Sequence, residues 1–202
     1  MILEGIITTT NDDGSVNISP MGPLVDDAMR VLVLRPYQTS TTYRNLKRTG
    51  QAVFHVTDDV ELLAHAAVGT PDPLPPLEPA TAVAGWILTG ACRWYALGVR
   101  SLDDRQQRTE IVCDVVDQGH LRDFFGFNRA KHAVVEAAIL ATRKHLLDAD
   151  FLRTEFERLQ VPIDKTGSPA EHRAFEFLKQ WITASVGEIP KSKIQNPKSS
   201  AP

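Results

Sequence analysis

The chain changes its hydrophobic period about two thirds of the way along, and this change limits the folds that it can adopt. Residues 2–9 are apolar and β-branched apart from Glu4 and Gly5, and residues 16–19 alternate apolar with polar. The Asn-Asp-Asp-Gly sequence at 11–14, between these two segments, favours a tight hairpin. Residues 130–147 instead carry alanines and aliphatic side chains at helical spacing. The sequence therefore predicts an α+β protein, mainly β, in which an antiparallel sheet precedes a set of helices.

Further segments of both kinds complete this outline. Five prolines within residues 71–79 exclude a helix or a central strand and predict an extended surface loop. Pro20 and Pro23 are expected to end the second strand, because proline has no N–H to donate. The other expected strands cover residues 29–34, 51–57, 86–99 and 109–116, with a charged connection over 100–108. Helices are expected over residues 42–49, 60–67, 149–159 and 169–186, the first ending before Gly50.

Composition excludes several classes of function. The 202 residues include 22 basic and 25 acidic side chains, a formal net charge of −3, whereas a general nucleic-acid binder needs a basic surface. No apolar run approaches the ~18 residues that cross a membrane, and the first residues lack the basic start of a secretory signal. Cys92 and Cys113 are too few for a disulfide framework, and we expect two thiols buried in strands. These features predict a cytoplasmic protein that binds neither nucleic acid nor membrane.

Short motifs with an established chemistry are absent from the sequence. It has neither the Gly-x-Gly-x-x-Gly dinucleotide fingerprint, nor the Gly-x-x-x-x-Gly-Lys-Ser/Thr phosphate loop, nor a Gly-x-Ser-x-Gly nucleophile elbow. Its six histidines show no metal-ligand spacing, so no metal site is expected. No side chain can be named as a general acid or base, and Glu136 has no partner that the sequence reveals. The sequence therefore leaves the catalytic residues unknown.

One segment has the character of a phosphate site. Residues 35–50 contain four basic side chains and no acidic one. Four consecutive hydroxyl residues, Thr39, Ser40, Thr41 and Thr42, stand where the expected helix begins. A helix N-terminus exposes unpaired N–H groups that suit a phosphate, and Arg35 can add a charge-assisted hydrogen bond. The alternative is an ordinary helix cap, which needs one hydroxyl rather than four.

A second segment has the character of a ring-binding strand. Residues 16–22 form a strand that ends in a Ser-Pro-Met-Gly turn, which offers exposed backbone amides and carbonyls beside an apolar thioether. This combination suits the edge of a flat heteroaromatic ring. The alternative is a plain hairpin strand that ends in a turn, which would have the same sequence pattern. A phosphate site and a ring-edge strand on neighbouring β-elements are what a flavin mononucleotide (FMN) requires.

The two segments resemble a known family when they are taken in order. The sequences Asn17-Ile-Ser-Pro-Met-Gly22 and Arg35-Pro-Tyr-Gln-Thr-Ser-Thr-Thr42, with the continuation to Asp59, look like the flavin-reductase-like FMN-binding split barrels. Within that superfamily the chain most resembles a prokaryotic branch of unknown function. That branch carries a helical segment similar to Gly126-Phe-Asn-Arg-Ala-Lys-His-Ala-Val-Val-Glu-Ala137. The resemblance covers most of residues 1–185.

The resemblance implies a fold, an assembly and a set of cofactor contacts. The fold would be a six-stranded antiparallel Greek-key split barrel with a C-terminal helical extension, assembled as a homodimer with FMN near the subunit interface. The family positions around the isoalloxazine match Asn17, Ser19, Met21 and Gly22. Those at the phosphate and ribityl chain match Arg35, Thr39, Ser40, Thr41, Thr42 and Asn45. The domains would be an FMN-binding barrel over 1–125, a helical extension over 126–187 packed on the barrel, and a disordered tail over 188–202.

Three functions remain open from the sequence. The first is an FMN-dependent oxidoreductase, whose substrate the family's genomic setting suggests could be a pterin of one-carbon metabolism. The second is a flavin carrier or sensor without turnover, and the third is an interaction protein without flavin. The electron donor and acceptor are not predicted.

The start of the long C-terminal helix also has two interpretations. Asn128 can cap the helix, or Arg129, Lys131 and His132 can line a pocket for an anionic substrate. Trp94 and Tyr95 are candidates for ring stacking, but we expect them to pack in the core.

Overall fold

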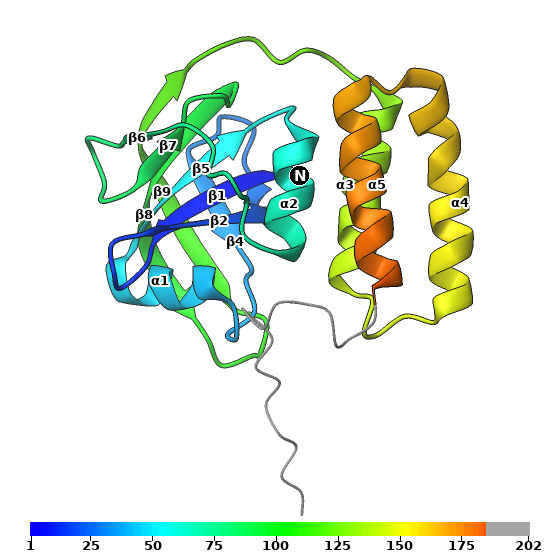
Figure 1. Cartoon of the computed structure of the whole chain (residues 1–202). Coiled ribbons are helices and arrows are strands. Elements are labelled where there is room, and N and C mark those ends of the chain that lie inside the picture. Colours follow the sequence, from blue (N-terminus) through cyan, green and yellow to red (C-terminus); the bar gives the residue numbers. More distant parts are fainter. Residues whose placement is uncertain (185–202) are drawn as a thin grey trace, which may run out of the picture.

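The computed structural model describes residues 1–184, so the tail expected at 188–202 lies outside the described residues. Within them mainly strands come first and helices follow, as predicted (Figure 1). Two short strands, at 24–25 and within the predicted loop at 77–79, were not predicted. The strands are β1 (Gly5–Thr10), β2 (Val16–Met21), β3 (Leu24–Val25), β4 (Val31–Leu34), β5 (Gln51–Val56), β6 (Leu77–Pro79), β7 (Trp86–Leu88), β8 (Arg93–Asp103) and β9 (Glu110–His120). The helices are α1 (Thr41–Thr49), α2 (Val60–Val68), α3 (Arg129–Thr142), α4 (Ala149–Thr166) and α5 (Pro169–Thr183).

The main sheet has seven strands in the order β2-β1-β5-β8-β9-β4-β3, and every neighbouring pair is antiparallel. The prediction of an α+β fold on a curled antiparallel sheet is confirmed, but the strand count of six was wrong. The additional strand is β3, which follows Pro23 and pairs with β4 through Leu24↔Val33 and Val25↔Leu32. Sequence patterns did not reveal β3, because a two-residue strand has no period. Strands β6 and β7 form a separate two-stranded sheet.

The sheet curls because its two longest strands are irregular. The β8–β9 register shifts between Ala96 and Leu97 and again between Val99 and Ser101, and such bulges bend a strand and increase its twist. The concave side encloses an apolar cluster with members from most strands and from α1. The cluster includes Ile7, Leu32, Leu34, Tyr43, Leu46, Phe54, Leu97 and Ile111.

Two strand predictions need correction. Pro20 does not end β2, since it pairs with Ile6, and an edge strand tolerates a residue without an N–H. The strand expected over 86–99 is interrupted after Leu88 by a turn, and Cys92 lies in this break rather than in a strand. Both cysteines are buried free thiols, as expected, with Cys113 in β9. In addition, β8 continues to Asp103, into the predicted connection.

The three C-terminal helices pack together beside the sheet, and α3 and α5 of them pack against α2 (Figure 1). An apolar cluster is shared between the two parts of the chain: it includes Ile6 and Ile18 of the sheet, Leu63 of α2, Val134 of α3 and Phe175 of α5. Helix α4 is longer than the predicted 149–159, because it continues through Pro162 to Thr166. The turn beyond this proline stays helical because it is anchored by Ile163, which has no exposed surface.

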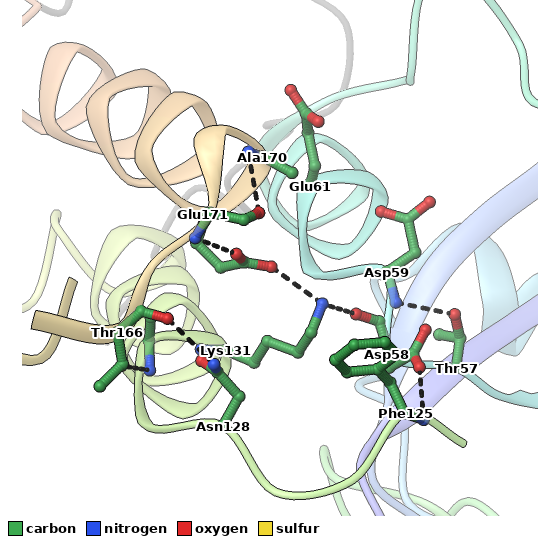
Figure 2. Close-up of polar contacts among 12 residues, drawn as sticks. Thr57, Asp58, Asp59, Glu61, Phe125, Asn128, Lys131, Thr166, Ala170 and Glu171 are labelled. Carbon is green, nitrogen blue, oxygen red and sulfur yellow. Dashed lines mark hydrogen bonds and ion pairs between the residues drawn. The ribbon is translucent and has the colours of Figure 1, made fainter.

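Charged side chains join the sheet to the helical extension at the start of α3 (Figure 2). Lys131 donates to Oε1 of Glu171 at 2.8 Å and to the carbonyl of Asp58 at 2.7 Å. The Asp58 carboxylate is paired with Arg122 and accepts from the Phe125 N–H at 2.9 Å. The hydrogen bonds from Arg122 lower the pKa of Asp58 to about 2. Those from Lys131 and Ser168 outweigh burial and lower the pKa of Glu171 to about 2.

None of the helices in the described part of the chain combines the length and apolar content that a membrane span requires.

Candidate functional site

Helix α1 is the element that organises the candidate site. Ser40 is its N-cap, with Oγ accepting from the Tyr43 N–H at 3.1 Å, and Gly50 ends it in the left-handed conformation at φ 66°. The first turn of α1 contains no acidic residue. Ser40 alone therefore caps α1, as an ordinary helix cap requires. The hydroxyls of Thr39, Thr41 and Thr42 take no part in the cap.

A buried polar network lies where α1 packs on β1 and β2. Nδ2 of Asn17 donates to Thr42 Oγ1 at 3.2 Å and to Thr9 Oγ1 at 3.1 Å. Nδ2 of Asn45 also donates to Thr9 Oγ1, at 3.0 Å. All four of these side chains are buried. The structure thus brings together residues from the two predicted segments, and Ser19 joins them through a longer contact of 3.4 Å with Asn17.

Thr9 is the member of this network that the sequence analysis missed. It has no exposed surface and bridges two of the predicted residues, Asn17 and Asn45. The available signal was the polar sequence Thr8-Thr9-Thr10-Asn11 at the end of an otherwise apolar strand. The hydrophobic period of the strand does not show whether its polar end forms a buried network or is simply exposed to solvent.

A cavity of about 360 Å³ opens between the β1–β2 turn and the outward face of α1. Two of its lining residues, Thr41 and Asn45, were predicted from the sequence. Arg44 adds positive charge, whereas Arg48 is paired with Asp12 across the cavity. Arg44 donates to the Thr39 carbonyl and to Thr41 Oγ1, which fixes its guanidinium over the first turn of the helix. The rest of the lining belongs to the turn: Asn11, Asp12 and Asp13.

Arg35 lies at the end of β4 rather than in this network. Its Nε is buried and has no hydrogen-bond partner in the described part of the chain. Residues 36–40 continue from it towards α1, and the tip of the β8–β9 hairpin holds them: Gln38 donates to the carbonyls of Asp104 and Gln106. No hydrogen bond joins Arg35 to Thr39–Thr42 among the described residues. A buried guanidinium N–H without an acceptor is costly, and an anionic ligand would remove that cost.

The remaining predicted ring contacts lie at the far end of β2. Met21 is half-buried and packs against the apolar cluster inside the sheet. Gly22 follows it and lies under the carboxylate of Glu4, since a Cβ on Gly22 would lie 2.8 Å from Glu4 Oε1. Partial burial and the charge of Glu136 raise the pKa of Glu4, so Glu136 has a neighbour that the sequence did not reveal.

At the start of α3, Asn128 acts as a helix cap, which was the simpler of the two interpretations of this segment. Asn128 caps the helix through the Lys131 N–H at 3.1 Å, and the Lys131 ammonium is paired with Glu171. Arg129 and His132 are exposed. Tyr95 is buried in the apolar cluster, and Trp94 packs on a smaller one, so both serve the core as expected. Among residues 1–184 no three potential metal ligands lie close enough to hold an ion.

Solved structures with a similar fold include several flavoproteins. An FMN-bound protein from Methanosarcina mazei is 22% identical to this chain, with a TM-score of 0.76 over 89% of this chain and 94% of that one. A nitrilotriacetate monooxygenase component B homologue from Mycobacterium thermoresistibile has a TM-score of 0.51 at 13% identity, covering 61% and 71% of the two chains. The flavin reductase of styrene monooxygenase from Pseudomonas putida S12 has a TM-score of 0.50 at 13% identity, covering 59% and 79%. The expected split-barrel likeness is confirmed in the fold.

Sequence comparisons identify the family itself. A search of the curated proteins finds no match. The model of the N-terminal domain of "Protein of unknown function (DUF447)" matches residues 3–122, which is more than half of the chain. The second model, described as "Protein of unknown function (DUF447)", matches residues 128–180, the helical extension. The chain therefore belongs to the family of proteins of unknown function DUF447.

Proposed function

We propose that this protein binds FMN between the β1–β2 turn and α1 and serves as an FMN-dependent oxidoreductase. The observation that carries the proposal is the convergence of Asn17 and Ser19 with Thr42 and Asn45 in one polar network. These residues come from two segments, and each segment was assigned to a different part of the same cofactor. The FMN-bound relative of similar fold supports the choice of FMN.

The chemistry of the donors fits a phosphate monoester at the start of α1. Thr41 lines the cavity with Arg44, and the helix N-terminus above them has no acidic residue to oppose an anion. Arg35 has a buried N–H that lacks an acceptor. The carboxylates of Asp12 and Asp13 lie on the turn side of the cavity, so the phosphate is expected on the α1 side.

The residues of β2 fit the flat part of the cofactor. We place the isoalloxazine beside Ser19, Met21 and Gly22, with the half-buried Met21 thioether as its apolar contact. Bound flavin supplies hydride or electron transfer, and the protein supplies position and electrostatics. The substrate is proposed to be a small molecule, with a pterin as one candidate, and the protein is proposed to work in the cytoplasm. A second copy is proposed to complete the site, as in the split-barrel resemblance.

Affinity for FMN compared with riboflavin tests the phosphate assignment. The double variant Arg35→Gln/Thr41→Val should bind FMN about a hundred- to ten-thousandfold more weakly, because it removes two charge-assisted hydrogen bonds that are each worth ~1.5–3 kcal/mol. Its affinity for riboflavin, which has no phosphate, should stay unchanged in titration calorimetry. Arg153→Gln, at an exposed position on α4, is the matched control for loss of a positive charge. A parallel loss of both ligands would mean a damaged fold and would contradict the assignment.

Turnover separates the enzyme from a flavin carrier or sensor. Bound FMN in an oxidoreductase should be bleached by NADH or NADPH without oxygen and should regain its visible absorption when an acceptor is added. A carrier would bind FMN with the same phosphate dependence, but neither nucleotide would bleach it.

A further inference from the structure

The connection between β9 and α3 exposes three aromatic rings close together in the sequence. The exposed fractions are 46% for Phe124, 86% for Phe125 and 94% for Phe127. Leu121, at the start of the same segment, is 41% exposed. Single exposed apolar residues are common on protein surfaces, but three exposed phenylalanines within four residues are unusual and are typical of an interaction site. We call residues 121–127 the aromatic segment.

The backbone of the aromatic segment is held in place although its rings are exposed. The buried carboxylate of Asp58 accepts from the Phe125 N–H at 2.9 Å (Figure 2) and is paired with the Arg122 guanidinium. Leu121 and Arg122 also donate their backbone N–H groups to the Cys92 carbonyl, at 2.9 and 3.3 Å. The segment ends at the α3 cap, Asn128. A surface whose backbone is fixed in advance loses little conformational entropy when a partner binds.

The charges around the rings point to the kind of partner. Arg122 is neutralised by Asp58 and Lys131 by Glu171, so the centre of the surface carries little net charge. At one end Asp123 has a side chain that is 97% exposed, and its carboxylate contacts only the imidazole of His120 in the described part of the chain. At the other end Arg129 is exposed and forms no ion pair with any residue of 1–184. Along the sequence, an exposed acid therefore precedes the aromatic rings and an exposed base follows them.

We infer that this surface binds the same surface of a second copy of the chain, related to it by a two-fold axis near Gly126. Asp123 and Arg129 each lie three positions from Gly126, so an antiparallel pairing places the acid of each copy opposite the base of the other. In a two-fold interface the same patch meets itself, which requires this kind of self-complementarity. Gly126 has a φ of 110° and open space where a Cβ would lie, so the two backbones can approach at the axis.

The exposed area is sufficient for such an interface. With ~200 Å² for each phenylalanine, the exposed fractions leave about 450 Å² of aromatic surface on each copy. Two copies then bury about 900 Å² of rings, and Leu121 and the charged ends bring the total to the ~1,000 Å² of a specific interface. This surface gives the proposed homodimer a location; it rests on that part of the proposed function and not on FMN binding.

Light scattering of purified full-length variants tests the surface. Wild type is expected to be a dimer at micromolar concentration, and Phe125→Ser/Phe127→Ser should raise the dimer dissociation constant at least ~100-fold, as loss of central aromatic contacts does. Phe151→Ser, which removes a 49% exposed phenylalanine from α4, is the matched control and should remain dimeric. FMN affinity is measured on the same samples, so that loss of dimer and loss of cofactor are scored separately.

A charge exchange tests the antiparallel arrangement. Asp123→Arg and Arg129→Asp should each weaken the dimer about tenfold through like-charge contacts, and the double exchange should restore it to within about threefold of wild type. A monomeric wild type overturns both the homodimer and this surface, and vesicle binding by that monomer would assign the rings to a membrane instead. A dimer that survives the Phe125/Phe127 change, or a double exchange that does not restore it, overturns this surface alone.

Discussion

A buried histidine makes the stability of this protein depend on pH in a definite window. His55 on β5 has no exposed surface, and its two ring nitrogens are both used: Nδ1 contacts the Ile6 carbonyl at 3.2 Å, and Nε2 accepts from the Leu88 N–H at 3.0 Å. Accepting at Nε2 requires the neutral ring with its proton on Nδ1. Burial lowers the pKa of His55 from 6.5 to about 4.

The sign and the size of the effect follow from this lowered pKa. Below pH 6.5 the unfolded chain takes up a proton at His55, while the folded chain does not until about pH 4. The stability contributed by the neutral ring is complete above pH 6.5 and is lost as the pH falls towards 4. Its slope is about 1.4 kcal/mol per pH unit, so the free energy of unfolding should fall by ~3 kcal/mol across the window.

Urea unfolding of wild type and of His55→Gln between pH 7.5 and 4 measures this loss. The variant loses packing and hydrogen bonds and should be less stable at pH 7.5, but it has no group to titrate at this position. Its deficit relative to wild type should therefore shrink by about 2 kcal/mol between pH 6.5 and 5. His145→Gln, in the exposed connection between α3 and α4, is the control. A deficit of His55→Gln that stays constant across this range would refute the reasoning.

Two substitutions and one labelling experiment give further predictions. Lys131→Met leaves the buried Glu171 carboxylate without its cation and should lower the free energy of unfolding by about 3 kcal/mol in urea at pH 7. Gly50→Ala should lower the free energy of unfolding by ~1 kcal/mol in the same assay, because a φ of 66° is unfavourable for alanine. The cost should not be larger, since no neighbouring atom lies within 4 Å of the new Cβ. Burial raises the pKa of Cys113 to about 12, so its thiol should react with a disulfide reagent at pH 8 only as fast as the protein unfolds, as urea-dependent labelling would show.

The parts of the fold that local chemistry determines were predictable from the sequence. Ser40 and Gly50 bound α1 because a hydroxyl cap and a left-handed residue are local requirements, and the 11–14 turn joins two antiparallel strands for the same reason. The failures arose where distant contacts decide the outcome. Strand β3 forms because β4 lies alongside it, and α4 continues past Pro162 because Ile163 is buried beyond it.

The candidate site was predictable in its members but not in its geometry. The resemblance selected Asn17 and Thr42, and their hydrogen bond is a property of the folded chain that spacing does not reveal. Thr9 had no motif to mark it. The unpaired buried Nε of Arg35 likewise depends on packing around β4 and not on the residue type.

The apolar cluster that the sheet shares with α3 and α5 limits how far the N-terminal and C-terminal parts of the chain can evolve independently. The two family models leave a boundary between residues 122 and 128, yet Ile18 and Leu63 before it pack in the same cluster as Val134 and Phe175 after it. A gene fusion or deletion at that boundary would leave an uncovered apolar face on both products. The halves should consequently evolve as one unit, with compensating changes across the boundary, and the chain should melt in a single calorimetric transition.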